Sequence, residues 1–130
     1  MSARILIVDD DKEVREIVMF VLSRNGFEVV AAEDGRQLQR LLDICLKEEI
    51  GQLPDLIMLD VMMPGEDGYQ ICYNLRHDPA TRHIPIIIIT AHTEDIYQRI
   101  SVDLGAIQHI TKPFHPLALA EQVKGLLKMR

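Results

Sequence analysis

Five polar side chains stand where apolar runs of this sequence end, and the three carboxylates among the five could together bind a cation. The five are Asp9, Asp10, Asp60, Thr90 and Lys112. Like charges that lie side by side stay ionised only when a cation is near, so three carboxylates in one place favour a metal site. A site built only from oxygen ligands prefers Mg²⁺, or Mn²⁺, to zinc. The five residues therefore predict a divalent metal site with a hydroxyl and an amine beside it.

The acids at 9–11 also have a simpler interpretation, which is helix capping. An Asp just before a helix accepts hydrogen bonds from the free backbone N–H groups at its start. One residue is enough for this, and Asp11 is placed to serve. Capping therefore leaves Asp9 and Asp10 unexplained, and the metal site is the better hypothesis.

Asp60, Thr90 and Lys112 are each ordinary when taken singly. Asp is common in turns, Thr is common in strands, and Lys is usually a solvated surface charge. Asp60, however, closes an apolar run and is followed by three more apolar residues, whereas a turn residue usually lies within its loop. The evidence for a functional site is that each of these three residues ends a different predicted strand.

Between these ends the chain alternates the patterns of strands and helices. Strands are predicted at 5–8, 27–32, 56–59, 86–89 and 107–111, and the runs at 5–8, 56–59 and 86–89 are continuously apolar, which is typical of strands buried on both faces. Apolar residues at helical spacing lie in 14–22, 38–46, 69–77, 96–104 and 116–127. The alternation predicts an α/β fold, a doubly wound (βα)5 sandwich with a five-stranded parallel sheet. The carboxyl ends of parallel strands share one edge, which gathers the polar residues there.

The composition limits the possible functions. The 130 residues suit one domain, 1–130, and 14 Lys and Arg against 20 Asp and Glu give a net charge of −6, which opposes direct binding of nucleic acid. No apolar run approaches the ~20 residues of a membrane span, and no signal peptide is recognisable, so we expect a cytoplasmic protein. Cys45 and Cys72 are expected to be buried thiols. The stretch 47–54 is the one irregular connection.

Four segments resemble the receiver domain of bacterial two-component response regulators, which has the fold of the chemotaxis response regulator. They read ILIVDD at 5–10, PDLIMLDVMMPG at 54–65, PIIIITA at 85–91, and GA at 105–106 with KPF at 112–114. The resemblance covers essentially the whole chain. It implies the flavodoxin-like strand order 2-1-3-4-5.

The resemblance also implies which residues accept a phosphoryl group and hold a metal ion. Asp60 would be the phosphate acceptor. Asp10 and Asp60 would ligate Mg²⁺, and Asp9 would help through a water molecule. The backbone carbonyl of Met62 would complete the protein ligands, so its apolar side chain is no objection.

Two further residues would contact the phosphoryl group itself. Thr90 would bond one phosphoryl oxygen and Lys112 would pair with another, while the small Ala91 would leave the approach open. The peptide bond between Lys112 and Pro113 is similar to one that the family holds cis.

Thr90 is also the implied start of a switch. In the family its hydroxyl moves towards the phosphate, and a ring on the fifth strand turns inward behind it. Here the ring position is His109, where the family usually has Tyr or Phe. His109 either serves as the switch or is a polar residue on an edge strand, and the sequence leaves both open. His92 occupies a position that affects loss of the phosphoryl group in the family. No pair among the other histidines has the i, i+4 spacing suited to a metal, and we expect all of them to be surface groups: His77, His83, His92 and His115.

The resemblance implies protein partners. The phosphodonor would be a sensor histidine kinase or a phosphotransfer protein, and the domain would catalyse only its own phosphorylation and slow dephosphorylation. A downstream protein target would bind the face formed by the fourth helix, the fifth strand and the fifth helix, near 94–104 and His109. Since nothing follows Arg130, we expect a stand-alone receiver, although a piece cut from a longer protein would read the same. A homodimer is left open.

Three other functions fit the sequence less well. A phosphatase of the haloacid-dehalogenase type needs a second carboxylate two residues after its nucleophile, where this chain has Met62. A nucleotide-binding module needs glycines in the first strand-to-helix turn, and residues 9–13 contain none. A docking module without chemistry would have little need for Asp9 and Asp10 together.

Overall fold

The structure, a computed structural model, describes residues 3–47 and 53–128, in which five strands alternate with five helices. The strands are β1 (Arg4–Val8), β2 (Glu28–Ala32), β3 (Leu56–Asp60), β4 (Ile86–Thr90) and β5 (Gln108–Thr111). The helices are α1 (Lys12–Arg24), α2 (Gly35–Lys47), α3 (Gly68–His77), α4 (Asp95–Asp103) and α5 (Pro116–Lys128). Residues 48–52, most of the connection expected to be irregular, lie outside the described residues. Within the two described ranges, no helix has both the length and the apolar content needed to cross a membrane.

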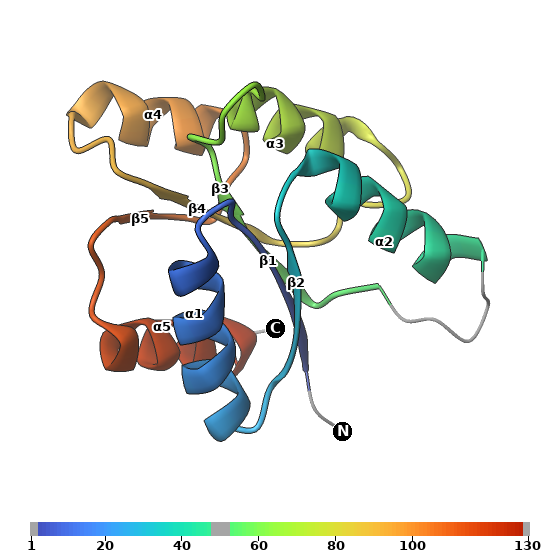
Figure 1. Cartoon of the computed structure of the whole chain (residues 1–130). Helices are drawn as coiled ribbons and strands as arrows, with labels where there is room; N and C mark the ends of the chain where they lie inside the picture. Colours follow the sequence, from blue (N-terminus) through green and yellow to red (C-terminus); the bar gives the residue numbers. More distant parts are fainter. Residues whose placement is uncertain (1–2, 48–52, 129–130) are drawn as a thin grey trace.

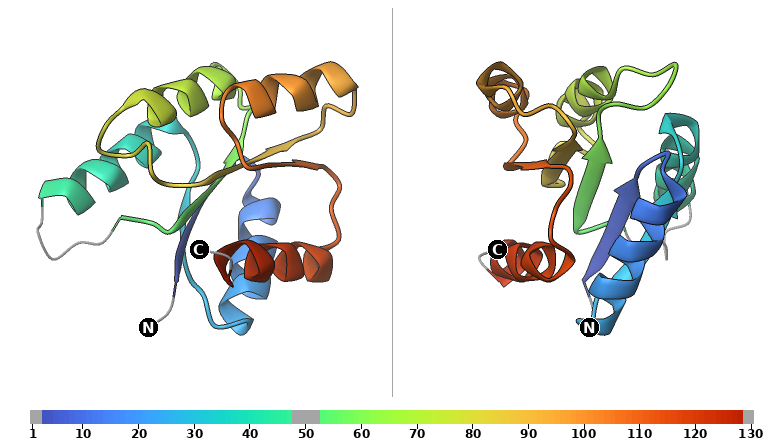
Figure 2. Two further views of the ribbon diagram at one scale, coloured as in Figure 1. Left: turned by 180° about the vertical axis from the view of Figure 1, so that it is seen from behind. Right: turned by 60° about the vertical axis from the view of Figure 1, so that its left-hand side comes forward.

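The strands form one parallel sheet in the order β2-β1-β3-β4-β5. Helices α1 and α5 cover one face, and α2, α3 and α4 cover the other (Figure 1 and Figure 2). The predicted doubly wound fold and its strand order are therefore confirmed. β2 and β5 are the edge strands, and the carboxyl ends of β1, β3 and β4 lie side by side in the middle of the sheet.

The sheet separates two hydrophobic cores, which explains why its strands do not alternate apolar and polar residues. Ile57 and Leu59 of β3 belong to the core under α2 and α3, whereas Leu56 and Met58 belong to the core under α1 and α5. Every residue of β3 and of β4 is buried. Each large apolar side chain buried in this way contributes roughly 1.5–3 kcal/mol relative to an exposed one. Strong burial thus fixes the two strands that end in Asp60 and Thr90.

Some residues that helical spacing groups with the inner faces are exposed instead. Ile17, Leu46 and Ile96 are 44%, 45% and 60% exposed. The apolar stripes of α1, α2 and α4 are wider than the strip of sheet that each helix covers, so their margins face solvent. For the same reason the prediction that Cys45 is buried is wrong, since its thiol is only half-buried. Cys72 is buried, and both cysteines are free.

Aspartates cap the helices that begin next to the ends of β1 and β3. The carboxylate of Asp11 accepts hydrogen bonds from the backbone N–H groups of Glu13 and Val14 at 2.9 and 3.4 Å. Asp67 does the same for the first turn of α3. The caps satisfy N–H groups that have no partner within the helix, which sets where each helix begins. Asp11 therefore has the capping role that the sequence predicted.

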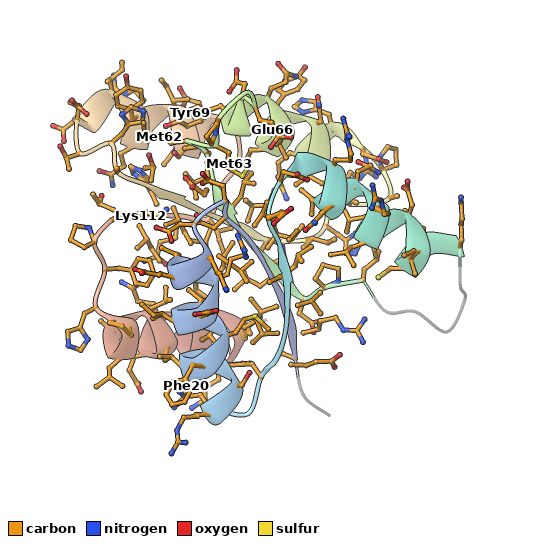
Figure 3. The ribbon with its side chains drawn as sticks, viewed as in Figure 1. Phe20, Met62, Met63, Glu66, Tyr69 and Lys112 are labelled. Atoms are coloured by element: carbon orange, nitrogen blue, oxygen red, sulfur yellow. The ribbon has the colours of Figure 1, made fainter. Side chains whose placement is uncertain are left out.

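A glutamate holds the start of α2 from a distant part of the chain. Both carboxylate oxygens of Glu66 accept from the backbone N–H of Gly35, at 3.0 and 2.9 Å. Glu66 lies in the connection between β3 and α3, close to the first turn of α2 (Figure 3). A carboxylate there is favoured by the positive end of the helix dipole. The contact joins the connection that follows Asp60 to a helix on the same face.

Gly68, the first residue of α3, packs directly against the backbone that follows β3. A Cβ atom added to Gly68 would lie 2.2 Å from Cα of Val61, closer than any real contact. Only glycine allows the two segments to approach in this way. The start of α3 is thereby fixed relative to Val61 and so to its neighbour Asp60.

We expect Gly68→Ala to lower the free energy of unfolding by about 1–3 kcal/mol, because the new methyl group would force α3 away from Val61. Gly125→Ala in α5 is the matched control. Nothing lies within 4 Å of the added Cβ there, so better helix propensity should raise the stability by about 1 kcal/mol. Urea unfolding followed by circular dichroism measures both, and a Gly68→Ala variant as stable as the wild type would contradict the close packing.

Candidate functional site

Three carboxylates gather at the carboxyl ends of β1 and β3. Parallel pairing of Val8 with Leu59 sets the residues that follow them side by side. One oxygen from each of Asp9, Asp10 and Asp60 lies within 4.8 Å of the other two. Asp9 and Asp60 are 0% and 2% exposed, whereas Asp10 is exposed. The structure thus brings together the three acids that the sequence singled out.

The ammonium group of Lys112 lies between the two buried carboxylates. Its Nζ is 2.8 Å from Asp9 Oδ2 and 3.3 Å from Asp60 Oδ2. The backbone N–H of Lys112 donates to the carbonyl of Thr90 at 2.7 Å, which holds the segment after β5 against the end of β4. The peptide bond between Lys112 and Pro113 is cis. Lys112 is therefore a partner of the acids and is not a solvated surface charge.

The two oxygens of Asp60 have different partners. Oδ1 accepts a hydrogen bond from the backbone N–H of Met62 at 2.9 Å, and Oδ2 faces Lys112. The Met62 side chain itself is 48% exposed and lies at this end of the sheet with Lys112 (Figure 3). These two contacts orient the Asp60 carboxylate.

Burial raises the pKa of Asp60 from 3.8 to about 6, and the charge of Asp9 acts in the same direction. The Met62 N–H and Lys112 lower the pKa of Asp60, but they do not cancel the effect of burial. Burial alone would lower the pKa of Lys112. The hydrogen bond to Asp9 and the charges of both carboxylates outweigh burial and raise it. The site thus favours the charged form of Lys112 and disfavours the charged form of Asp60.

The residues present fit a divalent cation. Three carboxylates and one ammonium leave two negative charges in a largely buried cluster. Every carboxylate ligand is a hard oxygen, and no sulfur or imidazole belongs to the cluster in the described part of the chain. Such a donor set suits Mg²⁺ or Mn²⁺. The cluster has the charge and ligand type that the sequence predicted for a metal site.

Thr90 ends β4 next to Asp60 and is fully buried. The register pairs Asp60 with Ile89, so Thr90 lies one residue beyond it at the same edge. Its Oγ1 accepts a hydrogen bond from the backbone N–H of His92 at 3.1 Å. The hydroxyl is therefore at the edge that holds the acids and is linked to the connection between β4 and α4.

His109 lies on β5, an edge strand, and its ring is half-buried. Burial lowers its pKa, and the nearby His92 lowers it further, so its surroundings favour the uncharged ring. Its Nε2 atom is buried, and no described group forms a hydrogen bond with it. The edge position agrees with the interpretation of His109 as a polar residue on an edge strand. The burial agrees with its interpretation as the switch.

The other histidines differ in their surroundings. His77, His83 and His115 are exposed, as expected from the sequence. His92 is half-buried, and its ring stacks on Tyr97. The interpretation of His92 as a surface group is therefore incomplete, because stacking on α4 could not be read from sequence spacing.

Sequence reasoning missed Arg15, which supports the acidic cluster from α1. Its Nη1 donates to the backbone carbonyl of Asp9 at 2.8 Å, and Nη2 lies 3.9 Å from a carboxylate oxygen of Glu33. The bond holds the turn that carries Asp9. The only signal in the sequence is a basic residue one turn after Asp11, a pattern too common to be specific.

Comparisons with known proteins agree with this geometry. The family model described as the response regulator receiver domain matches residues 5–124. The phosphate regulon transcriptional regulatory protein PhoB of Escherichia coli K12 is 38% identical over 128 residues, which are 98% of this chain and 53% of that protein. The chain thus spans about half the length of the curated relatives it matches.

Solved structures with the same fold cover nearly the whole chain. The chemotaxis response regulator CheY4 of Vibrio cholerae matches 96% of this chain and 98% of its own, with 28% identity and a TM-score of 0.80. The signal receiver domain of a signal transduction histidine kinase from Syntrophus aciditrophicus matches 98% of this chain and 91% of its own, with 35% identity and a TM-score of 0.83.

The raised pKa of Asp60 predicts how stability depends on pH when no divalent cation is present. The folded state binds a proton on Asp60 more tightly than the unfolded state does. The contribution of this proton to the free energy of unfolding is therefore complete below pH 4 and is lost as the pH rises through 6. We expect Asp60→Asn to raise the free energy of unfolding by about 2–3 kcal/mol at pH 7.5 and to change it little at pH 4.

Chemical denaturation in EDTA at both pH values measures this difference. The exposed Asp43→Asn is the matched control and should have little effect at either pH. Excess Mg²⁺ should stabilise the wild type and shrink the advantage of Asp60→Asn. An Asp60→Asn variant that is less stable than the wild type at pH 7.5 in EDTA would contradict the assigned electrostatics.

Proposed function

Since the chain belongs to the response regulator receiver domain family, we propose that it accepts a phosphoryl group on Asp60 and relays a signal through protein partners. The observation that carries the proposal is the setting of this carboxylate. It is buried at a strand end, one oxygen is held by a backbone N–H, and the other faces an ammonium that also contacts Asp9. Phosphoryl transfer depends mainly on positioning and on neutralised charge, and this setting provides both.

Receiver domains bind Mg²⁺ at their acidic pocket. We propose that Asp10 and Asp60 are ligands here, that Asp9 acts through a water molecule, and that the Met62 carbonyl completes the set. The bound ion would supply positive charge for the oxygens of the incoming phosphoryl group. The burial of Asp9 and Asp60, and the exposure of Asp10 at the rim, support this assignment.

In the proposed reaction an oxygen of Asp60 forms a bond to phosphorus while the bond from phosphorus to a histidine nitrogen of the donor breaks. The leaving nitrogen keeps the electron pair. Lys112, already within 3.3 Å of Asp60, would pair with one phosphoryl oxygen, and the Thr90 hydroxyl would bond another. The exposed Ala91 would leave the approach open.

The proposed product turns over slowly. Hydrolysis of an acyl phosphate is faster when a general acid or base is near, and the residue two positions after Asp60 is Met62. Met62 has neither function. The domain would therefore promote its own phosphorylation and slow dephosphorylation, and it would not act on separate substrates.

Receiver domains interact with histidine kinases or phosphotransfer proteins. We propose such a protein as the phosphodonor, which places the domain in the cytoplasm, and we propose residues 1–130 as a single receiver domain. A downstream protein would bind the face of α4, β5 and α5, where Ile96, Val102 and Ile107 are exposed. A homodimer through this face is a further proposal, and direct contact of the acidic domain with nucleic acid is not proposed.

We expect the purified chain to gain one phosphoryl group when it is incubated with Mg²⁺ and acetyl phosphate, as measured by intact-protein mass spectrometry. Asp60→Asn should abolish the adduct, because the nucleophilic oxygen is gone while the fold is kept. Asp43→Asn, which makes the same change at an exposed carboxylate, should retain it. A phosphoryl group that persists in Asp60→Asn would overturn the assignment of the acceptor.

We expect Asp10→Asn to weaken Mg²⁺ binding roughly tenfold or more, because it removes a charged ligand. Asp11→Asn is the matched control. It removes the same charge from the next residue, but Asn is an equally good helix cap. Isothermal titration with Mg²⁺ measures both affinities. Equal losses in the two variants would indicate a general charge effect, contrary to ligation by Asp10.

A further inference from the structure

Three aromatic rings from three parts of the chain stack into a column beside the site. The ring of His92, between β4 and α4, lies 3.7 Å from that of Tyr97 in α4, with an angle of 10° between their planes. Tyr97 lies 6.4 Å from Tyr69 of α3, at an angle of 19°. We call these three residues the ring column. Stacked pairs of this kind are stabilising beyond the area that they bury.

One end of the ring column is joined to the hydroxyl of Thr90. The backbone N–H of His92 donates to Thr90 Oγ1 at 3.1 Å. If this hydroxyl turns towards a phosphoryl oxygen on Asp60 and keeps the bond, it draws the His92 backbone along. The ring of His92 then changes its position relative to Tyr97.

The other end of the ring column is fixed. Tyr69 is the second residue of α3, whose first turn is capped by Asp67. The preceding Gly68 packs on the Val61 backbone with no room for a side chain. Tyr69 also packs against the core between the sheet and α2 and α3. It therefore serves as a fixed support against which the other two rings can shift.

Helix α4, which carries the middle ring, is held weakly by its other contacts. Glu94 at its N-cap makes no side-chain hydrogen bond to the helix. The one fully buried residue of α4 is Ser101, and its hydroxyl donates to the Tyr97 carbonyl within the same helix. Ile96 and Val102 are 60% and 62% exposed. The contacts of Tyr97 with His92 and Tyr69 attach the first turn of α4 to the connection after β4 and to α3.

His109 offers no comparable link. Its buried Nε2 forms no hydrogen bond with any residue in the described ranges, and it belongs to β5, which pairs with β4 along Ile88. A strand paired in a sheet has less freedom to move than the first turn of a helix that lacks a side-chain N-cap bond. The ring column is the connected route between Thr90 and the exposed residues of α4.

We propose that the ring column carries the state of Thr90 to α4, with His92 and Tyr97 as positioning residues. The proposal rests on the proposed function, because it requires an acceptor on Asp60 to move Thr90. Its output is a shift of the first turn of α4, which changes how Ile96 is presented on the face assigned to a downstream partner.

The test uses the full chain with Mg²⁺ and beryllium fluoride, which imitates a phosphoryl group on a carboxylate, and records ¹H–¹⁵N amide shifts. In the wild type we expect shifts at Thr90, at His92 and along α4. Tyr97→Leu keeps apolar bulk but removes the stack, so it should keep the shift at Thr90 and lose most of the change along α4. His92→Ala, which leaves the backbone N–H in place, should do the same.

Two control variants complete the test. Tyr73→Leu removes another stacked ring, which lies 3.9 Å from His77 on α3, and it should respond like the wild type. Tyr97→Phe keeps the ring and should also respond like the wild type. If Tyr97→Leu does not fold, His92→Ala and Tyr97→Phe decide between the outcomes.

Full α4 shifts in Tyr97→Leu or His92→Ala would overturn the proposal, and so would an equal loss in Tyr73→Leu. Failure of the proposed function gives a different result. In that case the wild type shows neither a shift at Thr90 nor a phosphoryl adduct by mass spectrometry. If the adduct forms and Thr90 shifts but α4 stays unchanged in the wild type, the acceptor assignment stands and the ring column is refuted.

Discussion

The architecture depends on the neutralisation of two buried carboxylates at neighbouring strand ends. Asp9 and Asp60 are at most 2% exposed, and an unpaired charge in such a place is strongly destabilising. Lys112, which comes from the far edge of the sheet, lies between them. Its backbone is bonded to Thr90, so one residue ties the ends of β1, β3 and β4 to the segment after β5. The sheet must have its observed register for this to occur.

A single ammonium does not balance three carboxylates, and the remaining negative charge opposes the arrival of a phosphoryl group. A phosphoryl group on Asp60 would bring about 1.5 to 2 further negative charges into the cluster. Under the proposed function the cluster would need a divalent cation before it could accept the group, and this would couple binding of the ion to transfer. The rim position of Asp10 suits this order, since a hydrated ion can reach an exposed carboxylate first.

Local patterns in the sequence predicted much of this structure. The apolar runs predicted the five strands, of which the three central ones are buried, and residues at their ends met because parallel strands share an edge. The cap at Asp11 followed from one residue and its neighbours. What escaped prediction depends on rotation of a helix or on contacts far apart in sequence. The bond from Glu66 to Gly35 spans 31 positions, and the stack of His92 on Tyr97 depends on the path of a connection that has no periodic pattern.

The close packing of Gly68 on Val61 has a consequence for how this protein can vary. Surface connections usually tolerate insertions and deletions. The connection from 61 to 67 has three attachments. It begins next to Asp60, and it ends at α3, whose Gly68 packs back on Val61 at the start of the connection. Glu66 also binds the amide of Gly35. A residue added or removed there would break one of the three attachments. We expect the length of this stretch to be the same in any active homologue, even where its side chains have diverged.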